Sequence, residues 1–235
     1  MINVRKVLGN NYNEWNENIL PHIIEMEYDK PQEINKLLDK SISLADNEGW
    51  WMEFGTHTGF TGCHIAKRLK ELYPHLIDKK LIAFDSFEGL PEDWIKGNED
   101  VGKGEFDLNG EIPNILKKTL NILPVKGWFK DSLPNFIKHT FNPNQKISFL
   151  HMDADLYSST KTVFDNLKPY FRGKCVIQFD EFCGYPKAGE EEYKAFYEFL
   201  EENKNNILDV KSIGKGGTPN HRPESVSYLI TFKNK

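Results

Sequence analysis

The chain lacks the features that mark membrane, secreted and nucleic-acid-binding proteins. Its 235 residues contain no apolar run approaching the roughly 20 residues that cross a bilayer, and no apolar stretch of the kind found in signal peptides stands near Met1. No block of basic residues is present, and the net charge is −5. A basic surface is what attracts nucleic acid, so we expect neither a membrane partner nor a nucleic-acid partner.

Cysteine is scarce as well. The three cysteines, Cys63, Cys175 and Cys183, are odd in number and none stands in a CxxC spacing. This set is typical neither of a disulfide framework nor of a zinc site, and it suits a reducing compartment. We therefore predict a cytoplasmic protein.

The GxGxxG motif of dinucleotide-binding proteins is also missing. The stretch that comes nearest to it is residues 51–62, WMEFGTHTGFTG, in which an apolar run reaches Glu53 and glycines follow at Gly55 and Gly59. Glycines let the backbone pass close to a ligand, and the free N–H groups of a helix start face whatever binds there. The stretch predicts a first strand, a tight ligand-binding loop and a helix N-terminus.

The rest of the chain alternates between short apolar runs and amphipathic segments. Helices are expected at 60–73, 113–120, 158–169 and 189–203, and strands at 81–84, near 124, at 147–150, 175–179, 207–213 and 225–232. A glycine-rich turn at 214–217 is expected to join the last two strands. Strands that alternate with helices before a closing hairpin predict an α/β fold with a mostly parallel sheet.

Two regions stand outside this alternation. Residues 1–47 carry helical patterns and are predicted to form an N-terminal helical cap or lid on a main domain of residues 48–235; these helices are also compatible with a homodimer contact. Residues 92–112 are polar, contain glycine, and are long for an idle connection in a compact domain. They predict a mobile lid or substrate loop, and disorder without a role is the alternative.

Acidic residues follow four of the predicted strands. They are Glu53, Asp85, Asp153, Asp155, Asp180 and Glu181. Open parallel sheets bind ligands at the carboxyl ends of their strands, and like charges gathered there call for a cationic partner. A single strand-end acid is usually a helix cap or a surface charge, but four such loops predict a site. Carboxylates suit both the hydroxyls and amino group of a nucleoside cofactor and a hard divalent ion such as Mg²⁺.

Five motifs in this order resemble the macrocin and mycinamicin O-methyltransferase family, S-adenosylmethionine-dependent enzymes that modify macrolide and aminocoumarin sugars. They are EFGxxxG from residue 53, FDSFEGLP at 84–91, GWFKDSLP at 127–134, MDADLYxST at 152–160 and FDEF at 179–182. The resemblance implies the class I methyltransferase fold. That fold is a Rossmann-like, seven-stranded, mostly parallel sheet with an antiparallel final strand, helices on both faces and, here, an N-terminal helical cap.

The resemblance also implies a site for S-adenosylmethionine. Its cofactor-binding residues would be Glu53, Gly55, Thr56, His57, Gly59, Asp85, Ser86, Gly127, Trp128, Phe129 and Asp153. The glycine loop would surround the methionine part, Asp85 would hold the ribose, and residues 127–129 would lie near the adenine.

The resemblance further implies that Asp153, Asp180 and Glu181 hold Mg²⁺. The family usually ends this set with two aspartates, so Glu181 is a departure. Its extra methylene leaves open whether the carboxylate binds the ion directly or through water.

The predicted activity is Mg²⁺-dependent transfer of a methyl group from S-adenosylmethionine to a hydroxyl of a small molecule, such as a sugar or glycosylated metabolite. Asp153 is predicted to accept the hydroxyl proton. Related catechol O-methyltransferases carry a lysine at the position that is Leu156 here, which excludes a lysine base at that point. Two alternatives stay open: a nicotinamide-dependent oxidoreductase, and a cofactor-binding Rossmann-like protein without metal-dependent catalysis.

Overall fold

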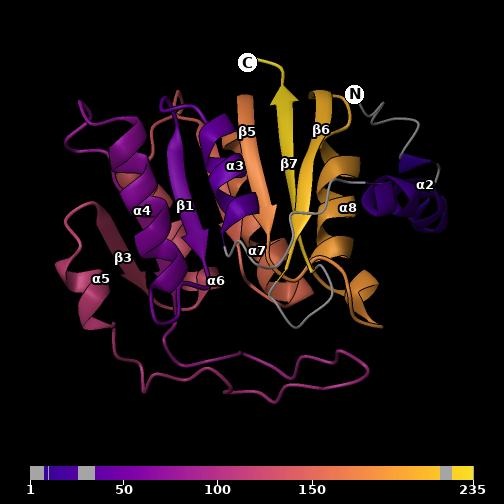
Figure 1. The fold of residues 1–235 in the computed structure, drawn as a ribbon, viewed down its shortest axis with the longest axis horizontal. Helices are drawn as coiled ribbons and strands as arrows, with labels where there is room; N and C mark the ends of the chain where they lie inside the picture. Colours follow the sequence, from indigo (N-terminus) through magenta and orange to yellow (C-terminus); the bar gives the residue numbers. More distant parts are fainter. Residues whose placement is uncertain (1–7, 10, 26–34, 218–223, 235) are drawn as a thin grey trace.

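A seven-stranded sheet forms the centre of the protein (Figure 1). The structure is a computed structural model, which describes residues 8, 9, 11–25, 35–217 and 224–234. The strand order is β3-β2-β1-β4-β5-β7-β6. The strands are β1 (Trp50–Phe54), β2 (Leu81–Asp85), β3 (Ile122–Lys126), β4 (Ile147–Met152), β5 (Gly173–Phe179), β6 (Ile207–Gly216) and β7 (Ser225–Phe232).

The strand directions confirm the predicted sheet. Strands β1 to β5 pair in parallel with one another. Strand β7 runs antiparallel to both β5 and β6. The turn predicted at 214–217 is wrong in its position, because β6 continues to Gly216, which pairs with Ser225. Backbone pairing with β7 holds these glycines in the strand, and residues 218–223 lie outside the described part of the chain.

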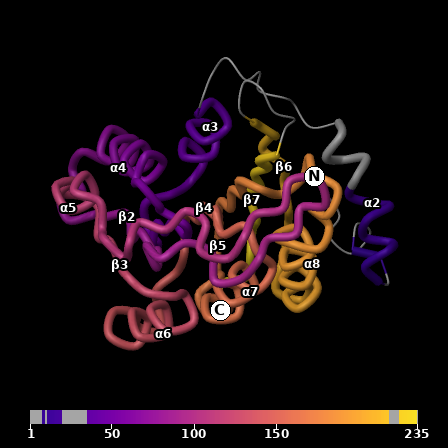
Figure 2. Tube along the Cα trace, turned by 90° about the horizontal axis from the view of Figure 1, so that it is seen from below, coloured from indigo at the N-terminus to yellow at the C-terminus, as the bar shows by residue number. Residues whose placement is uncertain are grey.

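Helices cover both faces of the sheet (Figure 2). Those on one face are α3 (Lys36–Leu44), α4 (Phe60–Leu72) and α5 (Asn114–Lys118); those on the other are α6 (Phe129–Thr140), α7 (Tyr157–Leu167) and α8 (Glu192–Asn203). Alternation along β1 explains the two layers, since successive side chains of a strand point to opposite faces. Trp51 joins the apolar cluster under α3 and α4, whereas Phe54 joins the cluster under α6, α7 and α8.

The two described N-terminal helices lie in different places. In α2 (Tyr12–Glu25), Trp15 is buried against Tyr193 and Tyr197 of α8. Helix α3 instead belongs to the layer that covers the sheet, where it contacts β5, β6 and α4. Residues 1–7, 10 and 26–34 of the predicted cap lie outside the described residues. The division of the chain at residue 47 stays a prediction.

Hydrogen bonds between neighbouring strand ends align the loops that follow the strands. The N–H of Gly55 donates to the carbonyl of Phe84 at 3.0 Å, and that of Asp153 donates to Phe54 at 2.9 Å. The N–H of Asp180 donates to Met152 at 2.9 Å in the same way. The strand-end acids are thereby brought to one edge of the sheet.

No helix in the described part of the chain combines the length and the hydrophobicity that crossing a membrane requires.

Candidate active site

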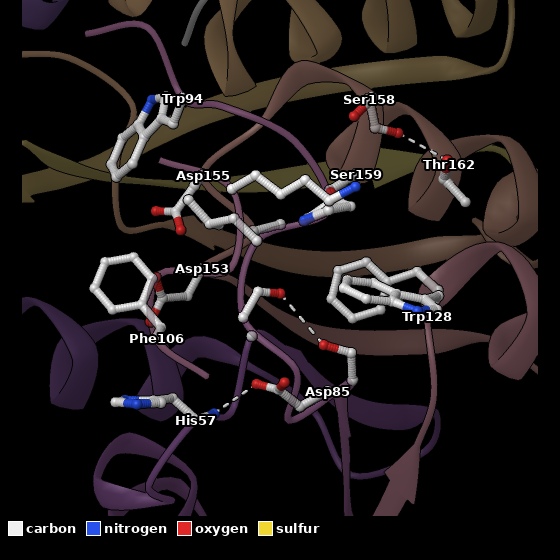
Figure 3. A pocket seen from close by; sticks show the side chains of 18 of the residues that line it. His57, Asp85, Trp94, Phe106, Trp128, Asp153, Asp155, Ser158, Ser159 and Thr162 are labelled. Atoms are coloured by element: carbon white, nitrogen blue, oxygen red, sulfur yellow. Dashed lines mark hydrogen bonds between the residues drawn. The ribbon is translucent and has the colours of Figure 1, made fainter. Parts of the chain in front are cut away.

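A cavity of about 620 Å³ opens at the carboxyl ends of the parallel strands, a size within the usual range for small-molecule sites. Its wall is formed by the loops after β1, β2, β3, β4 and β5, by part of the 92–112 segment and by the first turns of α7. Figure 3 shows Asp153 and Asp155 on one side of the cavity and Trp128 on the other, with His57 and Asp85 below them. The topology thus brings together loops far apart in the sequence.

The glycine loop after β1 approaches the end of β4 very closely. Gly55 has φ 88°, and a Cβ atom placed on it would stand 1.7 Å from the carbonyl oxygen of Asp153. Only glycine fits this contact and this backbone conformation. Gly55 and His57 line the cavity, as predicted for a loop that touches a ligand.

Asp85 fixes the shape of two loops at once. Its Oδ2 accepts the N–H of His57 at 2.7 Å, and its Oδ1 accepts the N–H of Phe87 at 2.6 Å. Burial raises the pKa of Asp85, and these two hydrogen bonds oppose that rise. An ionised carboxylate has about four acceptor positions, so Asp85 keeps positions for ligand hydroxyls in the cavity that it lines.

Four predicted cofactor residues do not line this cavity: Glu53, Thr56, Gly59 and Gly127. Glu53 is fully buried beneath α4. Its Oε2 would meet a Cβ atom on Gly62 at 2.5 Å, and its Oε1 lies 3.3 Å from the Nδ1 of His151. The other three residues shape loops. The Thr56 hydroxyl donates to the Phe84 carbonyl at 3.5 Å, and the Gly127 N–H donates to the Asp85 carbonyl. Gly59 is the residue before α4.

The remaining predicted cofactor residues do line the cavity. Ser86, Trp128 and Phe129 contribute to its wall beside Asp85 and Asp153. The Ser86 hydroxyl accepts the N–H of Glu88 at 3.0 Å, which closes the turn after β2. Trp128 precedes α6 and presents an aromatic surface on which a planar ring can stack.

Acidic side chains gather at the ends of β4 and β5. Asp153, Asp155 and Glu181 line the cavity, whereas Asp180 does not, and its Oδ1 accepts the Ser225 hydroxyl at 2.9 Å. Burial raises the pKa of Asp153 well above its ordinary value, and the charges of Asp180 and Asp155 raise it further. Burial also raises the pKa of Glu181 to about 9, with a further contribution from Asp180. The repulsion among these groups favours a cation in their midst.

The metal-site prediction has support from chemistry but not from geometry. The donors are all carboxylate oxygens, which are the ligands that Mg²⁺ prefers. Oε2 of Glu181 is buried and accepts no hydrogen bond from any other described residue. Within the described residues, however, no group of three or more acidic, histidine or cysteine side chains converges closely enough to hold an ion. The Mg²⁺ site therefore stays a prediction.

The predicted lid, residues 92–112, follows the rim of the cavity. Its Trp94 is buried against Tyr185, with ring centroids 5.7 Å apart, and Trp94 pairs with Val101 across the segment. The Lys96 ammonium lies 4.1 Å from the Trp94 ring centre and 3.6 Å from Oε2 of Glu181. Packing, a cation–π contact and an ion pair together attach this segment to the loop after β5.

Replacing Trp94 with alanine should detach the segment without unfolding the sheet. The ring belongs to a small apolar cluster separate from the two main ones, and losing about 3 kcal/mol of packing would raise the open population about 100-fold. Limited trypsin digestion should then cut after Lys96 and Lys103 correspondingly faster. Ile95→Ala is the control, because Ile95 is 40% exposed. Equal digestion of the two variants would show that Trp94 does not hold the segment.

Several residues of the cavity were not among the predicted site residues. Asp155 was recognised as a strand-end acid but given no role, yet it lines the cavity and has φ 61°, a left-handed conformation uncommon outside glycine. Lys103, Lys130 and Ser159 also line it. Lys130 and Ser159 lie within the GWFKDSLP and MDADLYxST motifs and Lys103 within the 92–112 segment, but the motifs gave none of the three a role, because which side chains face the cavity depends on how the loops fold over the sheet.

Residues 52–182 match a protein family described as "Methyltransferase domain". The match covers more than half of the chain. The chain belongs to this methyltransferase family. The fold of the chain is consistent with this family. It is similar to the crystal structure of CalS11, described as a calicheamicin methyltransferase. The TM-score is 0.64 at 21% identity, over 95% of this chain and 88% of that one.

Curated relatives match over shorter lengths. A threonylcarbamoyladenosine tRNA methylthiotransferase of Xenopus laevis is 26% identical over 180 residues, 66% of this chain. The 8-demethyl-8-(2,3-dimethoxy-alpha-L-rhamnosyl)-tetracenomycin-C 4'-O-methyltransferase of Streptomyces olivaceus is 28% identical over 115 residues, 42% of this chain. The chain spans 32% and 40% of the lengths of these two relatives.

Proposed function

We propose that this chain is an S-adenosylmethionine-dependent O-methyltransferase that acts on a hydroxyl of a small molecule, with a sugar or glycosylated metabolite as the acceptor. One observation carries the proposal. In a chain of the methyltransferase family, a single cavity joins Asp85, which keeps acceptor positions for ligand hydroxyls, to the acidic group at Asp153.

The acceptor class is supported by two relatives. The Streptomyces olivaceus protein is named as a methyltransferase acting on a rhamnosyl-bearing tetracenomycin. A second, apo structure of CalS11 is described as a TDP-rhamnose 3'-O-methyltransferase. Both printed names describe methylation of a molecule that carries a sugar, and we extend that class to this chain.

The cofactor, when bound, supplies the sulfonium methyl group. We assign Asp85 to the ribose hydroxyls, Trp128 and Phe129 to the adenine, and the loop of Gly55 and His57 to the methionine part. Glu53 would act through this loop, because its carboxylate is buried beneath α4. A buried side chain there would support the loop without entering the cavity.

We further propose that Asp153, Asp180 and Glu181 hold Mg²⁺. The ion, when bound, would supply Lewis acidity that lowers the pKa of the acceptor hydroxyl. Asp153 would accept the hydroxyl proton, and the wall formed by Asp153 and Trp128 would orient the acceptor. Attack of an oxyanion on a sulfonium cancels charge, so a segment that excludes water, such as 92–112, would favour it.

Both alternatives stay testable. Family membership counts against the nicotinamide-dependent oxidoreductase. The second alternative, a cofactor-binding protein without metal-dependent catalysis, stays open, because the described acids do not converge on a metal position. A cytoplasmic location and a homodimer also stay predictions.

Calorimetric titration should show saturable binding of S-adenosylhomocysteine, the product of methyl transfer, and none of NAD. Asp85→Asn should weaken that binding about 10- to 100-fold, because hydrogen bonds to a charged group contribute about 1.5–3 kcal/mol. Asp78→Asn, an exposed change before β2, is the control. Binding of NAD without S-adenosylhomocysteine would favour the oxidoreductase instead.

A further inference from the structure

We propose that the methyl acceptor carries a phosphate group, and that Lys103 and Lys130 bind that group. The inference rests on the proposed function, because it specifies what kind of hydroxylated molecule enters the cavity. It starts from two exposed lysines of the cavity wall, neither of which is ion-paired with another described residue.

The two lysines reach the cavity from different elements. Lys103 belongs to the 92–112 segment and Lys130 to the first turn of α6. Neither ammonium group makes a hydrogen bond or an ion pair with another described residue. The neighbouring lysines differ in this respect, since Lys96 pairs with Glu181 and Lys126 donates to the carbonyl of Gly110.

These cations are kept apart from the carboxylates of the same cavity. Asp85, Asp153, Asp155 and Glu181 all line it, yet none of them is ion-paired with Lys103 or Lys130. The wall therefore carries lysines and carboxylates that are not ion-paired with each other. A ligand that matches both must present a neutral or cationic part to the acids and an anionic part to the lysines.

The start of α7 adds one further hydrogen-bond donor to the cavity wall. Ser158, Ser159 and Thr162 lie together on one side of the cavity (Figure 3). Glu191 accepts the N–H of Tyr157 at 2.7 Å, the Ser158 hydroxyl donates to Glu92, and the Thr162 hydroxyl donates to the Ser158 carbonyl at 2.7 Å. The Ser159 hydroxyl, which makes no hydrogen bond with another described residue, therefore remains open to a ligand.

A phosphate group fits this set better than a single carboxylate does. Lysine binds phosphate as a point charge, and several phosphate oxygens can accept from two ammonium groups and from the Ser159 hydroxyl at the same time. The sulfonium cofactor brings one carboxylate, for which the glycine loop is already assigned. The acceptor would then be a sugar phosphate or a sugar nucleotide, with its reacting hydroxyl toward Asp153.

The test uses the whole chain saturated with S-adenosylhomocysteine. Inorganic pyrophosphate should bind in calorimetry, about 10-fold more weakly at about 200 mM than at about 50 mM salt, because salt screens these charges. A double substitution, Lys103→Ala with Lys130→Ala, should weaken binding at least about 10-fold. Lys138→Ala is the matched control, since Lys138 is an exposed lysine near the other end of α6 and does not line the cavity. Its affinity should be unchanged.

Two further titrations separate the sources of phosphate. Glucose 1-phosphate probes a sugar phosphate and UDP probes a sugar nucleotide, and the ligand that loses more affinity in the double variant identifies the class. Absence of pyrophosphate binding, equal affinity of the double variant and the wild type, or competition with S-adenosylhomocysteine would overturn the inference. Those results leave the proposed function intact if S-adenosylhomocysteine binds. If S-adenosylhomocysteine does not bind, the proposed function fails, and the inference, which rests on it, is overturned with it.

Discussion

Asp153→Asn should lower the rate of methyl transfer at least about 100-fold and remove its dependence on Mg²⁺, because a general base alone contributes about 10²- to 10⁴-fold. Asparagine has nearly the same shape but lacks the charge that would hold the ion and take the proton. The backbone N–H of residue 153 would still donate to the carbonyl of Phe54, so the strand end should keep its place.

The measurement has two parts. Formation of S-adenosylhomocysteine is followed with a panel of sugars, glycosides and sugar phosphates, with EDTA added and then with Mg²⁺ restored. Binding of Mn²⁺ is followed by electron paramagnetic resonance, which reports on the ion independently of activity. We expect the wild-type chain to lose its activity in EDTA and recover it with Mg²⁺, and Asp153→Asn to bind Mn²⁺ at least about 10-fold more weakly.

Asp165→Asn is the control for this experiment. Asp165 lies on α7, is 51% exposed and pairs with Lys161 away from the cavity. Undiminished transfer and Mn²⁺ binding in Asp153→Asn would contradict both assignments to Asp153. If transfer is lost only in Asp155→Asn, with Mn²⁺ binding unchanged, the proton acceptor is Asp155.

Gly55→Ala should destabilise the protein by several kcal/mol, on the order of 4, and abolish binding of S-adenosylhomocysteine. The new methyl carbon would stand 1.7 Å from the carbonyl oxygen of Asp153, so the ends of β1 and β4 would have to separate. The change also places alanine at φ 88°, where a side chain costs about 1–2 kcal/mol.

Gly173→Ala separates the two costs. Gly173, at the start of β5, also has positive φ, 61°, but a Cβ atom there would meet its nearest neighbour at 3.5 Å, an ordinary contact. It should therefore cost only about 1–2 kcal/mol. Urea unfolding measures both variants, and calorimetry measures their affinity for S-adenosylhomocysteine. Equal loss of stability in the two would show that the contact at Gly55 is not tight.

The sequence by itself determined the sheet and the edge that carries the site. Apolar runs, glycines and strand-end acids are local signals, because each depends on neighbours along the chain. They predicted the parallel strands, the reversed last strand and the placement of Asp85 and Asp153 on one cavity. The motifs also indicated the methyltransferase family, and the match over residues 52–182 confirms it.

Tertiary structure alone decided which acids face the cavity. Glu53 and Asp85 look equivalent in sequence, since each ends an apolar strand. In the sheet, Glu53 lies in register with Ala83, two residues short of Asp85, and the start of α4 covers it. The register of one strand against another depends on contacts far apart in the chain, so no local pattern fixes it.

The same limit explains the other differences. Strand β6 continues through Gly214 and Gly216 because β7 pairs with them, although glycine in a short stretch of sequence indicates a turn. Lys103 and Lys130 both line the cavity because the 92–112 segment and the start of α6, distant in sequence, both border it. Composition and spacing thus determined the fold and the positions of Asp85 and Asp153 in the site. Long-range packing decided which other side chains line the cavity.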